Sequence, residues 1–377
     1  MKLAFCLFKY FPFGGLQRDF ARIARACLLR GHEVHVYTMS WAGDPEPGLR
    51  IHIIPAKGWQ NHTRNYSFAQ NVKARLEKDK PDVVIGFNKM PYLDMYYAAD
   101  VCFQSRVREE HGFLYRLLPR YRRMVNLEKS IFESGKKTEI MLISSRQEKE
   151  YSQYYQTEAA RFHLLPPGIA RDRIAPPDAS DIRRALRKQY NIADDEILLL
   201  MVGSGFKTKG LDRAIRGLAF LPGMLRKSTR LFVIGEDKAA SFKKLADKLN
   251  VGSQVSFLGG RSDVPQFLLA ADLLVHPAYH ENTGTVLLEA VISGLPVLTT
   301  DVCGYAHYIK EANAGVVLPS PFAQDVYNTT LQKMLLSPNR SEWQRNGRSF
   351  AERPEIYSLP EKSADLIETV GQKRVSG

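Results

Sequence analysis

Short aliphatic or β-branched runs alternate with helix-period stretches along the whole chain. The runs predict strands at Leu3–Phe8, Val34–Tyr37, Val83–Gly86, Ile140–Ile143, Ile197–Val202, Leu231–Ile234, Val255–Leu258, Leu273–Val275 and Val297–Thr299. The stretches between them predict helices, among them Leu16–Leu29, Leu211–Leu221, Ala240–Leu249 and Thr285–Ile292. Continuous apolar strands with intervening helices are typical of parallel sheets covered on both faces. The pattern therefore predicts an α/β fold.

This alternation is interrupted once, between Leu164 and Asp181, where two proline pairs occur. Paired prolines continue neither a helix nor a central strand, so the interruption predicts a domain boundary. A chain of 377 residues is long enough for two domains, 1–167 and 168 onward. Each would be doubly wound, and two such domains facing each other would bring their ligand-binding strand ends to one cleft.

Composition narrows the class of protein. Hydrophobic residues make up 44% of the chain and charged residues 25%, which excludes a disordered, collagen-like or coiled-coil protein. The four cysteines are far apart, so neither a zinc site nor a disulfide framework is expected. No run approaches the roughly 18–20 apolar residues that span a bilayer. We therefore expect a cytosolic protein, or one attached to a membrane from the cytosolic side.

The charge is strongly basic and unevenly distributed. The formal net charge is +13, of which residues 1–167 carry +9 (26 basic minus 17 acidic) and the remainder +4 (27 minus 23). An excess of this size predicts a polyanionic partner, which could be nucleic acid, an anionic membrane surface or phosphorylated small molecules. The front half of the chain is where that partner is expected to bind.

The densest basic stretch is Arg106–Lys129, with seven basic and three acidic residues, a net charge of +4. Aromatic and aliphatic side chains interleave with the arginines, a composition typical of segments that bind anionic membranes or single-stranded nucleic acid. A helix with a solvated basic face is the alternative. Because the chain contains no RNA-binding motif, lipid phosphate is the better functional interpretation and nucleic acid the least favoured partner.

Two glycine-containing loops are candidates for phosphate binding. Gly203 and Gly205 follow a predicted strand without the third glycine of a dinucleotide fingerprint, which argues against an NAD site. Their continuation, Lys209-Gly210, opens the Leu211 helix and suits a diphosphate, although a solvated loop lysine would look the same.

The second loop, Gly14-Gly15, precedes the first predicted helix and would let a phosphate approach its N-terminus, or would simply form a sharp turn. Asp19 lies one turn into that helix and would face the same cleft if the loop lines it. By itself such a residue is more often an acidic group favoured by the helix dipole.

The segment from Glu281 to Glu289 carries the sharpest local pattern. Glu281 lies in a loop, and Glu289 lies two turns into the helix that follows Gly284. Carboxylates accept hydrogen bonds from sugar hydroxyls and ribose diols, while the backbone amides of 282–285 can meet a phosphate. The alternative is that the two glutamates bind no ligand, one being a solvated loop residue and the other an unrelated helix residue.

Metal ligands are not expected. No aspartate is followed by another two positions later, so the Asp-x-Asp pair that holds Mg²⁺ or Mn²⁺ on a nucleotide diphosphate is missing. The nine histidines show no zinc-binding spacing. His280, beside Glu281, is as readily a structural loop residue as a substrate ligand.

Taken together, these motifs resemble the retaining GT-B glycosyltransferases of family 4, whose signature is two glutamates separated by seven residues. Glu281–Glu289, Lys209-Gly210, Gly14-Gly15 and Gly294–Val297 match elements of that family. Longer strings resemble its branch that adds the first hexose to the heptose region of the lipopolysaccharide inner core: Ala4–Phe20, Gly86–Pro91, Ala98–Cys102, Leu165–Ile169, Val302–Ile309 and Tyr357–Lys362.

The resemblance implies a GT-B fold of two Rossmann-like domains, and a UDP-sugar as co-substrate without a cofactor or metal. The N-terminal domain, 1–167 joined by a C-terminal helix 357–377, would face acceptor and membrane, and 168–356 would bind the nucleotide sugar. By position, ribose binding is implied for Glu289, diphosphate binding for Arg173 and Lys209, the uracil edge for Arg261 and the sugar for Glu281. Asp19 and Gly15 would complete the site, with Asp19, Lys209 and Glu281 acting in catalysis.

The same resemblance implies a lipopolysaccharide inner-core acceptor and an enzyme that docks on the cytosolic face of the inner membrane through Arg106–Lys129. Two departures from the family pattern affect the donor. Ser204 stands where the wider family often has a phosphate-binding arginine, and Asn282, Thr283 and Thr285 are polar where close relatives have small or apolar residues. These extra hydrogen-bonding groups favour an N-acetylhexosamine such as N-acetylgalactosamine as a donor beside glucose.

Two other functions are compatible with the residues. One is a glycosyltransferase with a soluble acceptor, which would need no membrane surface. The other is a non-catalytic basic protein that binds polyanions through its α/β scaffold. Glu281 and Lys209 separate the transferase from the polyanion-binding protein, because transfer would require both residues and polyanion binding neither. Binding to anionic liposomes separates the membrane-bound transferase from one with a soluble acceptor.

Overall fold

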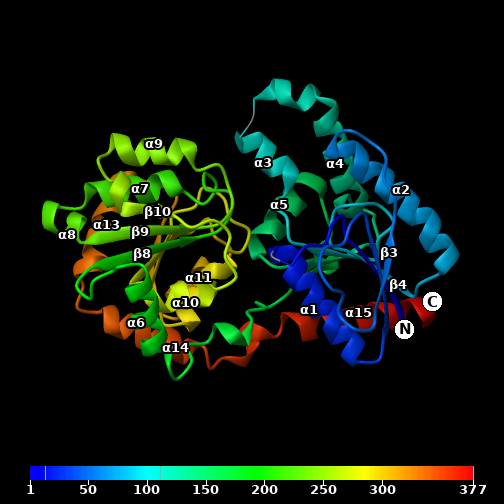
Figure 1. Ribbon diagram of the computed structural model, residues 1–377. Coiled ribbons are helices and arrows are strands. Elements are labelled where there is room, and N and C mark those ends of the chain that lie inside the picture. The colour runs from blue at the N-terminus through cyan, green and yellow to red at the C-terminus, as the bar shows by residue number, and fades with distance from the viewer. Residues whose placement is uncertain (13, 111, 377) are drawn as a thin grey trace. The chain divides into compact units, whose positions relative to one another are not determined.

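The computed structural model divides the protein into two compact units, Met1–Gly168 together with Tyr357–Gly377, and Ile169–Ile356 (Figure 1). It describes residues 1–12, 14–110 and 112–376, and the side chains of 109, 110, 375 and 376 lie outside that description. Each unit has its own parallel sheet and its own core, and each is described by itself below.

The first unit, called unit 1, is built on a seven-stranded parallel sheet of order β3-β2-β1-β4-β5-β6-β7. The strands are β1 (Lys2–Cys6), β2 (Glu33–Thr38), β3 (Leu49–Ile53), β4 (Val83–Gly86), β5 (Met95–Ala98), β6 (Glu139–Leu142) and β7 (Phe162–Leu164). The helices are α1 (Gly15–Leu29), α2 (Asn61–Asp79), α3 (Phe103–Glu110), α4 (Pro119–Phe132), α5 (Ser145–Tyr155) and α15 (Leu359–Ser376), with short 3₁₀ turns η1 (Phe113–Leu117) and η2 (Ala159–Arg161).

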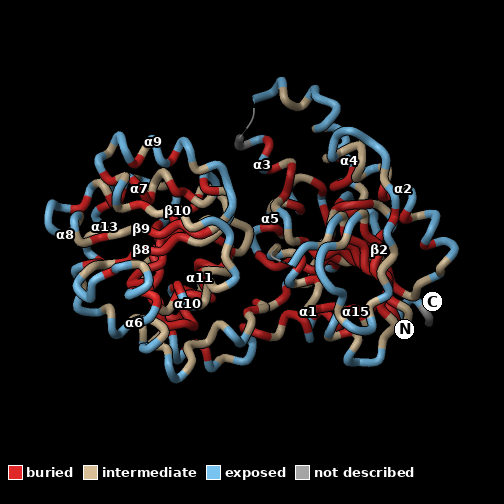
Figure 2. Tube along the Cα trace, viewed as in Figure 1, coloured by how far each residue is buried: buried red, intermediate tan, exposed pale blue. Residues whose placement is uncertain are grey.

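Two buried clusters cover the two faces of this sheet. Helices α1 and α15 pack on one face, with Phe20 and Ile367 in the core. Helices α2, α4 and α5 pack on the other, where Phe68 and Phe132 are fully buried. Figure 2 shows the strands between these layers as buried. Helix α15 is further tied to the end of α1 by Arg30, which donates to Asp365 and Glu368 at 2.8 and 3.0 Å.

The second unit, unit 2, has a six-stranded parallel sheet of order β10-β9-β8-β11-β12-β13. Its strands are β8 (Ile197–Val202), β9 (Thr229–Ile234), β10 (Val255–Phe257), β11 (Leu273–His276), β12 (Val297–Thr300) and β13 (Gly315–Leu318). Its helices are α6 (Ala179–Gln189), α7 (Leu211–Phe220), α8 (Gly223–Lys227), α9 (Ala240–Lys248), α10 (Val264–Ala270), α11 (Thr285–Ile292), α12 (Ala306–Glu311), α13 (Gln324–Leu336) and α14 (Arg340–Phe350), with turns η3 (Arg171–Arg173), η4 (Gly252–Gln254) and η5 (Pro354–Tyr357). Helices α7, α9 and α13 lie on one face, and α6, α10 and α11 on the other (Figure 1).

The predicted α/β class is confirmed, and all nine predicted strands are present with ends shifted by at most two residues. The four predicted helices are also present within one residue at each end. Strands β3, β5, β7 and β13 were not predicted. Strand β3 lies at the sheet edge with a half-exposed pattern, and β7 has only three residues, so neither forms an apolar run.

The alternative of a single helix with a solvated basic face over Arg106–Lys129 does not match the structure. The segment forms the end of α3, the turn η1 and most of α4, and Pro119 begins α4. Proline fits the first turn of a helix but not its interior, which explains the break. Glu109 and Glu110 were counted in the net charge of this stretch, and their side chains lie outside the described part of the chain.

Candidate functional site

The strand order of unit 2 places a topological switch point between β8 and β11. These strands are hydrogen-bonded neighbours, with Leu199 opposite Leu273. The helices that follow them, α7 and α11, cover opposite faces of the sheet. Loops leaving two such strands diverge at their carboxyl ends, and open α/β sheets bind ligands in the resulting crevice. Lys209 is in the loop after β8, and Glu281 is in the loop after β11.

Glycine allows these two loops to approach each other closely. Gly210 has φ of +79°, and a Cβ added there would lie 1.9 Å from the carbonyl oxygen of Pro277. Any other residue would therefore suffer both backbone strain and a clash. The amide of Tyr279 donates to the carbonyl of Thr208 at 2.8 Å, which joins the loops on either side of the contact. Gly210 is thus required for the close approach of the two loops, independently of the charge of Lys209.

Lys209 and Glu281, both predicted site residues, meet at this junction. The Lys209 ammonium forms an ion pair with Oε2 of Glu281, and the side chains are 20% and 12% exposed. Nε2 of His276, at the end of β11, lies 3.2 Å from the same carboxylate oxygen. Because His276 is only 1% exposed, Glu281 is held from the interior by an imidazole and from the loop by an ammonium.

This environment determines the charge of Glu281. Burial by itself would raise its pKa, but the hydrogen bond with His276 and the charge of Lys209 outweigh burial and lower the pKa from 4.5 to about 2. Glu281 is therefore a carboxylate at neutral pH. It can accept hydrogen bonds from hydroxyl groups and cannot donate a proton.

His276 and the residues that fix its loop were not predicted from the sequence, where only the neighbouring His280 was considered, as a loop residue or a substrate ligand. Thr299 and Thr300 of β12 donate to the carbonyls of His276 and Ala278 at 3.0 and 3.1 Å. Arg213 of α7 donates to Ala278 at 2.8 Å and stacks on Tyr279. A histidine that ends the apolar run LLVH at a strand terminus was the available signal.

Glu289 and Arg173, two further predicted residues, also come together within unit 2. Glu289 is buried in the second turn of α11, and the Nε atom of Arg173 in η3 lies 3.7 Å from its Oε1. That nitrogen is buried and makes no hydrogen bond within the described residues. An arginine that faces a buried carboxylate while leaving a donor unused is suited to receive a ligand oxygen.

The residues between the two glutamates form the start of α11. Gly284 has φ of +77° and precedes Thr285, the first residue of the helix. The hydroxyls of Thr283 and Thr285 lie 3.5 Å apart, and both residues are half-buried together with Asn282. The carbonyl of Thr283 accepts from Tyr305 at 2.8 Å, which fixes this loop against the segment after β12. The polar groups predicted beside the sugar are therefore held in place next to Glu281.

Arg261 lies in the loop after β10. It donates to both carboxylate oxygens of Asp263 at 2.7 Å and packs over the ring of Phe267. The amide of Gly235, after β9, donates to Gly259 at 2.8 Å, and a Cβ at Gly235 would lie 2.6 Å from the carbonyl oxygen of Gly203. The loops after β8, β9 and β10 are thus packed in sequence, with Arg261 on the outermost.

The remaining predicted residues lie in unit 1. Gly14 immediately precedes α1, and a Cβ there would lie 1.9 Å from the amide oxygen of Gln17, so a side chain would displace that residue. Gly15 is exposed, with open space where a Cβ would be. Asp19 accepts a hydrogen bond from the hydroxyl of Tyr97 at 2.7 Å. The roles of these three residues remain predictions.

The cysteine side chains are buried thiols. All four cysteines are buried, and burial raises the pKa of Cys6, Cys27, Cys102 and Cys303 to about 12. Within the described residues, no group of three or more histidine, cysteine, aspartate or glutamate side chains is arranged to hold a metal ion. None of the described helices is long and apolar enough to cross a membrane.

Two family models match the chain. The model for glycosyl transferases group 1 matches residues 182–350, and the model for glycosyltransferase family 4 matches residues 13–173. Among curated proteins, the chain is 50% identical over 368 residues to the lipopolysaccharide glucosyltransferase WaaG of Escherichia coli K12, which covers 97% of this chain and 98% of the relative. It is 24% identical to a D-inositol 3-phosphate glycosyltransferase of Xylanimonas cellulosilytica over 81% and 79% of the two chains.

Solved structures give the same result for the fold. The crystal structure of WaaG superposes with a TM-score of 0.92 at 50% identity and covers 97% of this chain and 99% of that one. Sucrose-phosphate synthase from Thermosynechococcus elongatus gives a TM-score of 0.77 at 19% identity, with 100% and 99% coverage. Anabaena HepE in complex with UDP-glucose gives 0.75 at 18% identity, with 98% and 100% coverage. The predicted GT-B fold of two Rossmann-like domains is confirmed.

Proposed function

The chain belongs to the glycosyltransferases of group 1 and family 4, and from this premise we propose that it transfers a hexose from a UDP-sugar to a heptose of the lipopolysaccharide inner core. The observation that carries the proposal is the meeting of Lys209, Glu281 and His276 at the switch point of unit 2. The 50% identity to a lipopolysaccharide glucosyltransferase over nearly the whole chain supports the acceptor class.

The donor contacts follow from charge and hydrogen-bonding capacity. Glu289, buried in α11, is suited to the ribose diol, and the unused Nε donor of Arg173 beside it is suited to a phosphate oxygen. Glu281 stays ionised and accepts from sugar hydroxyls. Lys209 holds three donors, so it can keep Glu281 as a partner while also meeting the diphosphate. Arg261 would take the uracil edge.

The reaction breaks the bond between the anomeric carbon and the UDP oxygen and forms a bond from that carbon to the acceptor hydroxyl oxygen. The hydroxyl proton leaves to the departing phosphate. Charge develops on the diphosphate, and in this proposal Lys209 and Arg173 stabilise it. Retention of the anomeric configuration and a catalytic role of Asp19 belong to this proposal. The ionised Glu281 serves orientation of the sugar and not proton transfer.

The polar residues beside Glu281 bear on which sugar the donor carries. Asn282, Thr283 and Thr285 add hydrogen-bonding groups at the start of α11, directly after Glu281. Such groups suit an acetamido substituent or an axial hydroxyl, so UDP-N-acetylgalactosamine is a donor candidate beside UDP-glucose.

A donor panel with purified enzyme and truncated lipopolysaccharide, read out as UDP release, tests the proposed reaction. We expect acceptor-dependent release with one of the two donors, and mass spectrometry of the product should show one added hexose or N-acetylhexosamine. A strong preference for UDP-glucose would remove the N-acetylhexosamine idea. Absence of acceptor-dependent release with every UDP-sugar would overturn the proposed function.

A membrane-docking role fits the surface formed by η1 and the start of α4, here called the docking surface. It presents four apolar side chains, 45–77% exposed, together with exposed arginines: Phe113, Leu114, Leu117, Leu118, Arg120 and Arg122. Exposed apolar groups rimmed by arginines are typical of segments that enter the headgroup region of an anionic membrane. We propose that this surface docks the enzyme on the cytosolic face of the inner membrane.

Flotation with vesicles of phosphatidylcholine and phosphatidylglycerol tests the docking surface. Replacing Leu114 and Leu117 by Glu should lower vesicle binding at least tenfold, since each leucine that becomes buried in the bilayer would contribute about 1.5–3 kcal/mol. Met224→Glu changes an equally exposed side chain of unit 2 and should bind like the wild type. Equal binding by both variants, or binding that ignores salt and anionic lipid, would favour the alternative of a soluble acceptor.

A further inference from the structure

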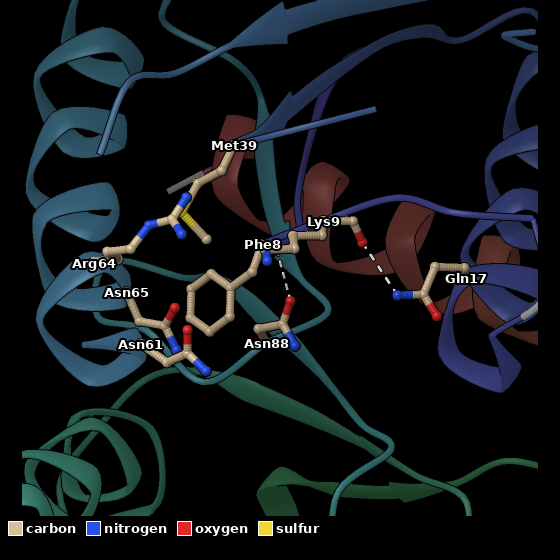
Figure 3. Close-up of a pocket in the computed structure, with 8 residues that line it drawn as sticks. All are labelled: Phe8, Lys9, Gln17, Met39, Asn61, Arg64, Asn65 and Asn88. Atoms are coloured by element: carbon tan, nitrogen blue, oxygen red, sulfur yellow. Dashed lines mark hydrogen bonds between the residues drawn. The ribbon is translucent and has the colours of Figure 1, made fainter. Parts of the chain in front are cut away.

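Unit 1 has a polar pocket of about 270 Å³ at its own topological switch point, between β1 and β4. Phe8 and Lys9 line it from the loop after β1, Asn88 from the loop after β4, Gln17 from α1 and Arg64 from α2 (Figure 3). The lining contains two cations and no carboxylate, and neither cation has an ion-pair partner among the residues that the structure describes. This pocket is therefore an open, basic site.

Gln17, the third residue of α1, fixes one side of this pocket. Its amide nitrogen donates to the carbonyl of Lys9 at 3.1 Å, so the helix holds the loop that leads into it. Figure 3 shows this bond and a second one, from the amide of Phe8 to Oδ1 of Asn88 at 2.7 Å, which joins the ends of β1 and β4. In unit 1, the third residue of the helix thus binds the loop that precedes its own helix.

The corresponding position in unit 2 is occupied by Arg213, the third residue of α7. Its side chain reaches the loop after the neighbouring strand, β11, where Nη1 donates to the carbonyls of Pro277 and Ala278 at 3.1 and 2.8 Å. Both of these residues are buried. Buried carbonyl oxygens require hydrogen-bond donors, and the guanidinium supplies one to each.

Two aromatic rings hold this guanidinium in place. Its Cζ atom lies 3.5 Å from the ring centroid of Tyr279 and 3.7 Å from that of Phe322, which follows β13. Two rings cannot occupy the same side of one planar group at these distances, so Arg213 is enclosed between them. Gln324, the first residue of α13, donates to the carbonyl of Arg213 at 3.1 Å. The arginine therefore joins the loops that follow β8, β11 and β13.

Tyr279 is itself bound to the segment after β8 at two points. Its amide donates to the carbonyl of Thr208 at 2.8 Å, and its hydroxyl donates to Asp212 at 2.9 Å. Lys209 is the residue after Thr208, and Glu281 lies two residues after Tyr279. A displacement of Tyr279 would therefore move Lys209 and Glu281 relative to each other.

We propose that Arg213 is a positioning residue of the transfer reaction, which holds the loop after β11 so that Glu281 and Lys209 keep the separation that the donor requires. It acts through the carbonyls of Pro277 and Ala278 and through the ring of Tyr279. The inference rests on the proposed function, in which Glu281 orients the sugar and Lys209 meets the diphosphate. An arginine is needed because a lysine cannot donate in a fixed plane to two carbonyls while it is stacked between rings.

Steady-state kinetics of the full-length enzyme with truncated lipopolysaccharide tests this role. Arg213→Gln should lower kcat about 10- to 100-fold, since a displacement of about 1 Å at a reacting centre can cost about 10²-fold, and should leave the acceptor KM within about threefold. Arg213→Lys keeps the charge and one donor, so its kcat should fall only about three- to tenfold. Arg216→Gln is the matched control, because Arg216 lies one turn further along α7 and is exposed, and its kcat should stay within about twofold of the wild type.

Binding separates positioning from a purely structural role. UDP, UDP-glucose and UDP-N-acetylgalactosamine are titrated into each variant by calorimetry. For the UDP-sugar that the wild type binds more tightly, the ratio of its dissociation constant to that of UDP should rise about tenfold in Arg213→Gln, because only the sugar meets Glu281. An arginine that merely stabilised the fold would leave this ratio unchanged.

The outcomes distinguish this inference from the proposed function. If the wild type transfers sugar and a folded Arg213→Gln keeps both its kcat and its ratio of dissociation constants, the inference alone fails. Equal losses of kcat in Arg213→Gln and Arg216→Gln also overturn it. Should Arg213→Gln not fold, Arg213→Lys provides the same comparison with the smaller loss. If the wild type transfers nothing, the proposed function fails, and the ratio of dissociation constants still decides whether Arg213 positions Glu281.

Discussion

Each unit has a polar site at the topological switch point of its sheet. The two sites differ in whether their cations have carboxylate partners. At the β8/β11 switch point of unit 2, Lys209 is neutralised by Glu281 and Arg173 faces Glu289. At the β1/β4 switch point of unit 1, the positive charge of Arg64 meets no carboxylate of the pocket lining. A common strand order thus supports one charge-compensated, buried site and one open, basic site.

This difference bears on how the side chains of each site are ordered. In unit 2, ion pairs hold the side chains in place before a ligand arrives, which favours a precise geometry around a reacting bond. In unit 1, Lys9 and Arg64 line the pocket without an ion-pair partner among the described residues, so no ion pair of that part of the chain orders their side chains. Breaking one partner should therefore be costly in unit 2 and nearly silent for stability in unit 1.

The largest expected effect is on turnover in unit 2. Lys209→Ala removes the cation nearest to the developing diphosphate charge, so transfer should fall about 10²–10³-fold. The turnover of Glu281→Ala should fall by a similar factor, because the sugar hydroxyls lose a hydrogen-bond acceptor and Lys209 loses its ion-pair partner. UDP release with saturating donor and acceptor measures both.

Lys207→Ala is the matched control, since Lys207 belongs to the same loop but pairs with Asp212 at 2.9 Å and is 67% exposed. Its turnover should stay within about threefold of the wild type. A Lys209→Ala enzyme that keeps more than a tenth of wild-type turnover would contradict the role of this charge, provided that circular dichroism shows the variant to be folded.

The sequence predicted unit 2 better than unit 1 for a physical reason. Glu281, Gly284 and Glu289 lie within nine consecutive residues, so local spacing alone places them at one loop and helix start. Strands with a buried centre, such as β8 and β11, also produce continuous apolar runs. Both features can be recognised in the chain without knowledge of the tertiary structure.

The pocket of unit 1 could not be found in this way. Its lining comes from loops after three strands and from the first turns of α1 and α2, which are brought together only by the order of the sheet. No spacing in the sequence connects Lys9 with Arg64 or Asn88. For the same reason His276 was missed, because its contact with Glu281 depends on the close approach of two loops at Gly210.

The second expected effect is on stability and its dependence on pH. The pKa of Glu281 is lowered to about 2 in the folded protein, so its contribution to stability is fully present above its ordinary value of 4.5 and is lost as the pH falls toward 2. Between pH 5 and pH 3 the wild type should lose about 2 kcal/mol more than Glu281→Gln. Urea unfolding at both pH values measures the difference.

The unit 1 pocket supplies the comparison for that measurement. Arg64→Gln breaks no ion pair, so its free energy of unfolding at pH 7 should stay within about 0.5 kcal/mol of the wild type. Glu281→Gln leaves Lys209 and His276 without their carboxylate and should lower it by about 1–3 kcal/mol. If both variants lost the same free energy of unfolding, the distinction between the charge-compensated site of unit 2 and the open, basic site of unit 1 would not hold.

The smallest expected effect concerns His276, which acts through Glu281 as a positioning residue. His276→Leu removes one hydrogen bond to the carboxylate, so turnover should fall about three- to tenfold, and the acid limb of the kcat profile should move to higher pH because the pKa of Glu281 rises. His276→Gln keeps a donor and should restore part of the turnover and of the acid limb. If His276 were only a packing residue of the β11 terminus, the two variants would lose stability without any shift of the pH profile. A shift in His276→Leu that His276→Gln reverses therefore assigns the imidazole to the orientation and charge of Glu281, the residue on which the compensated site of unit 2 depends.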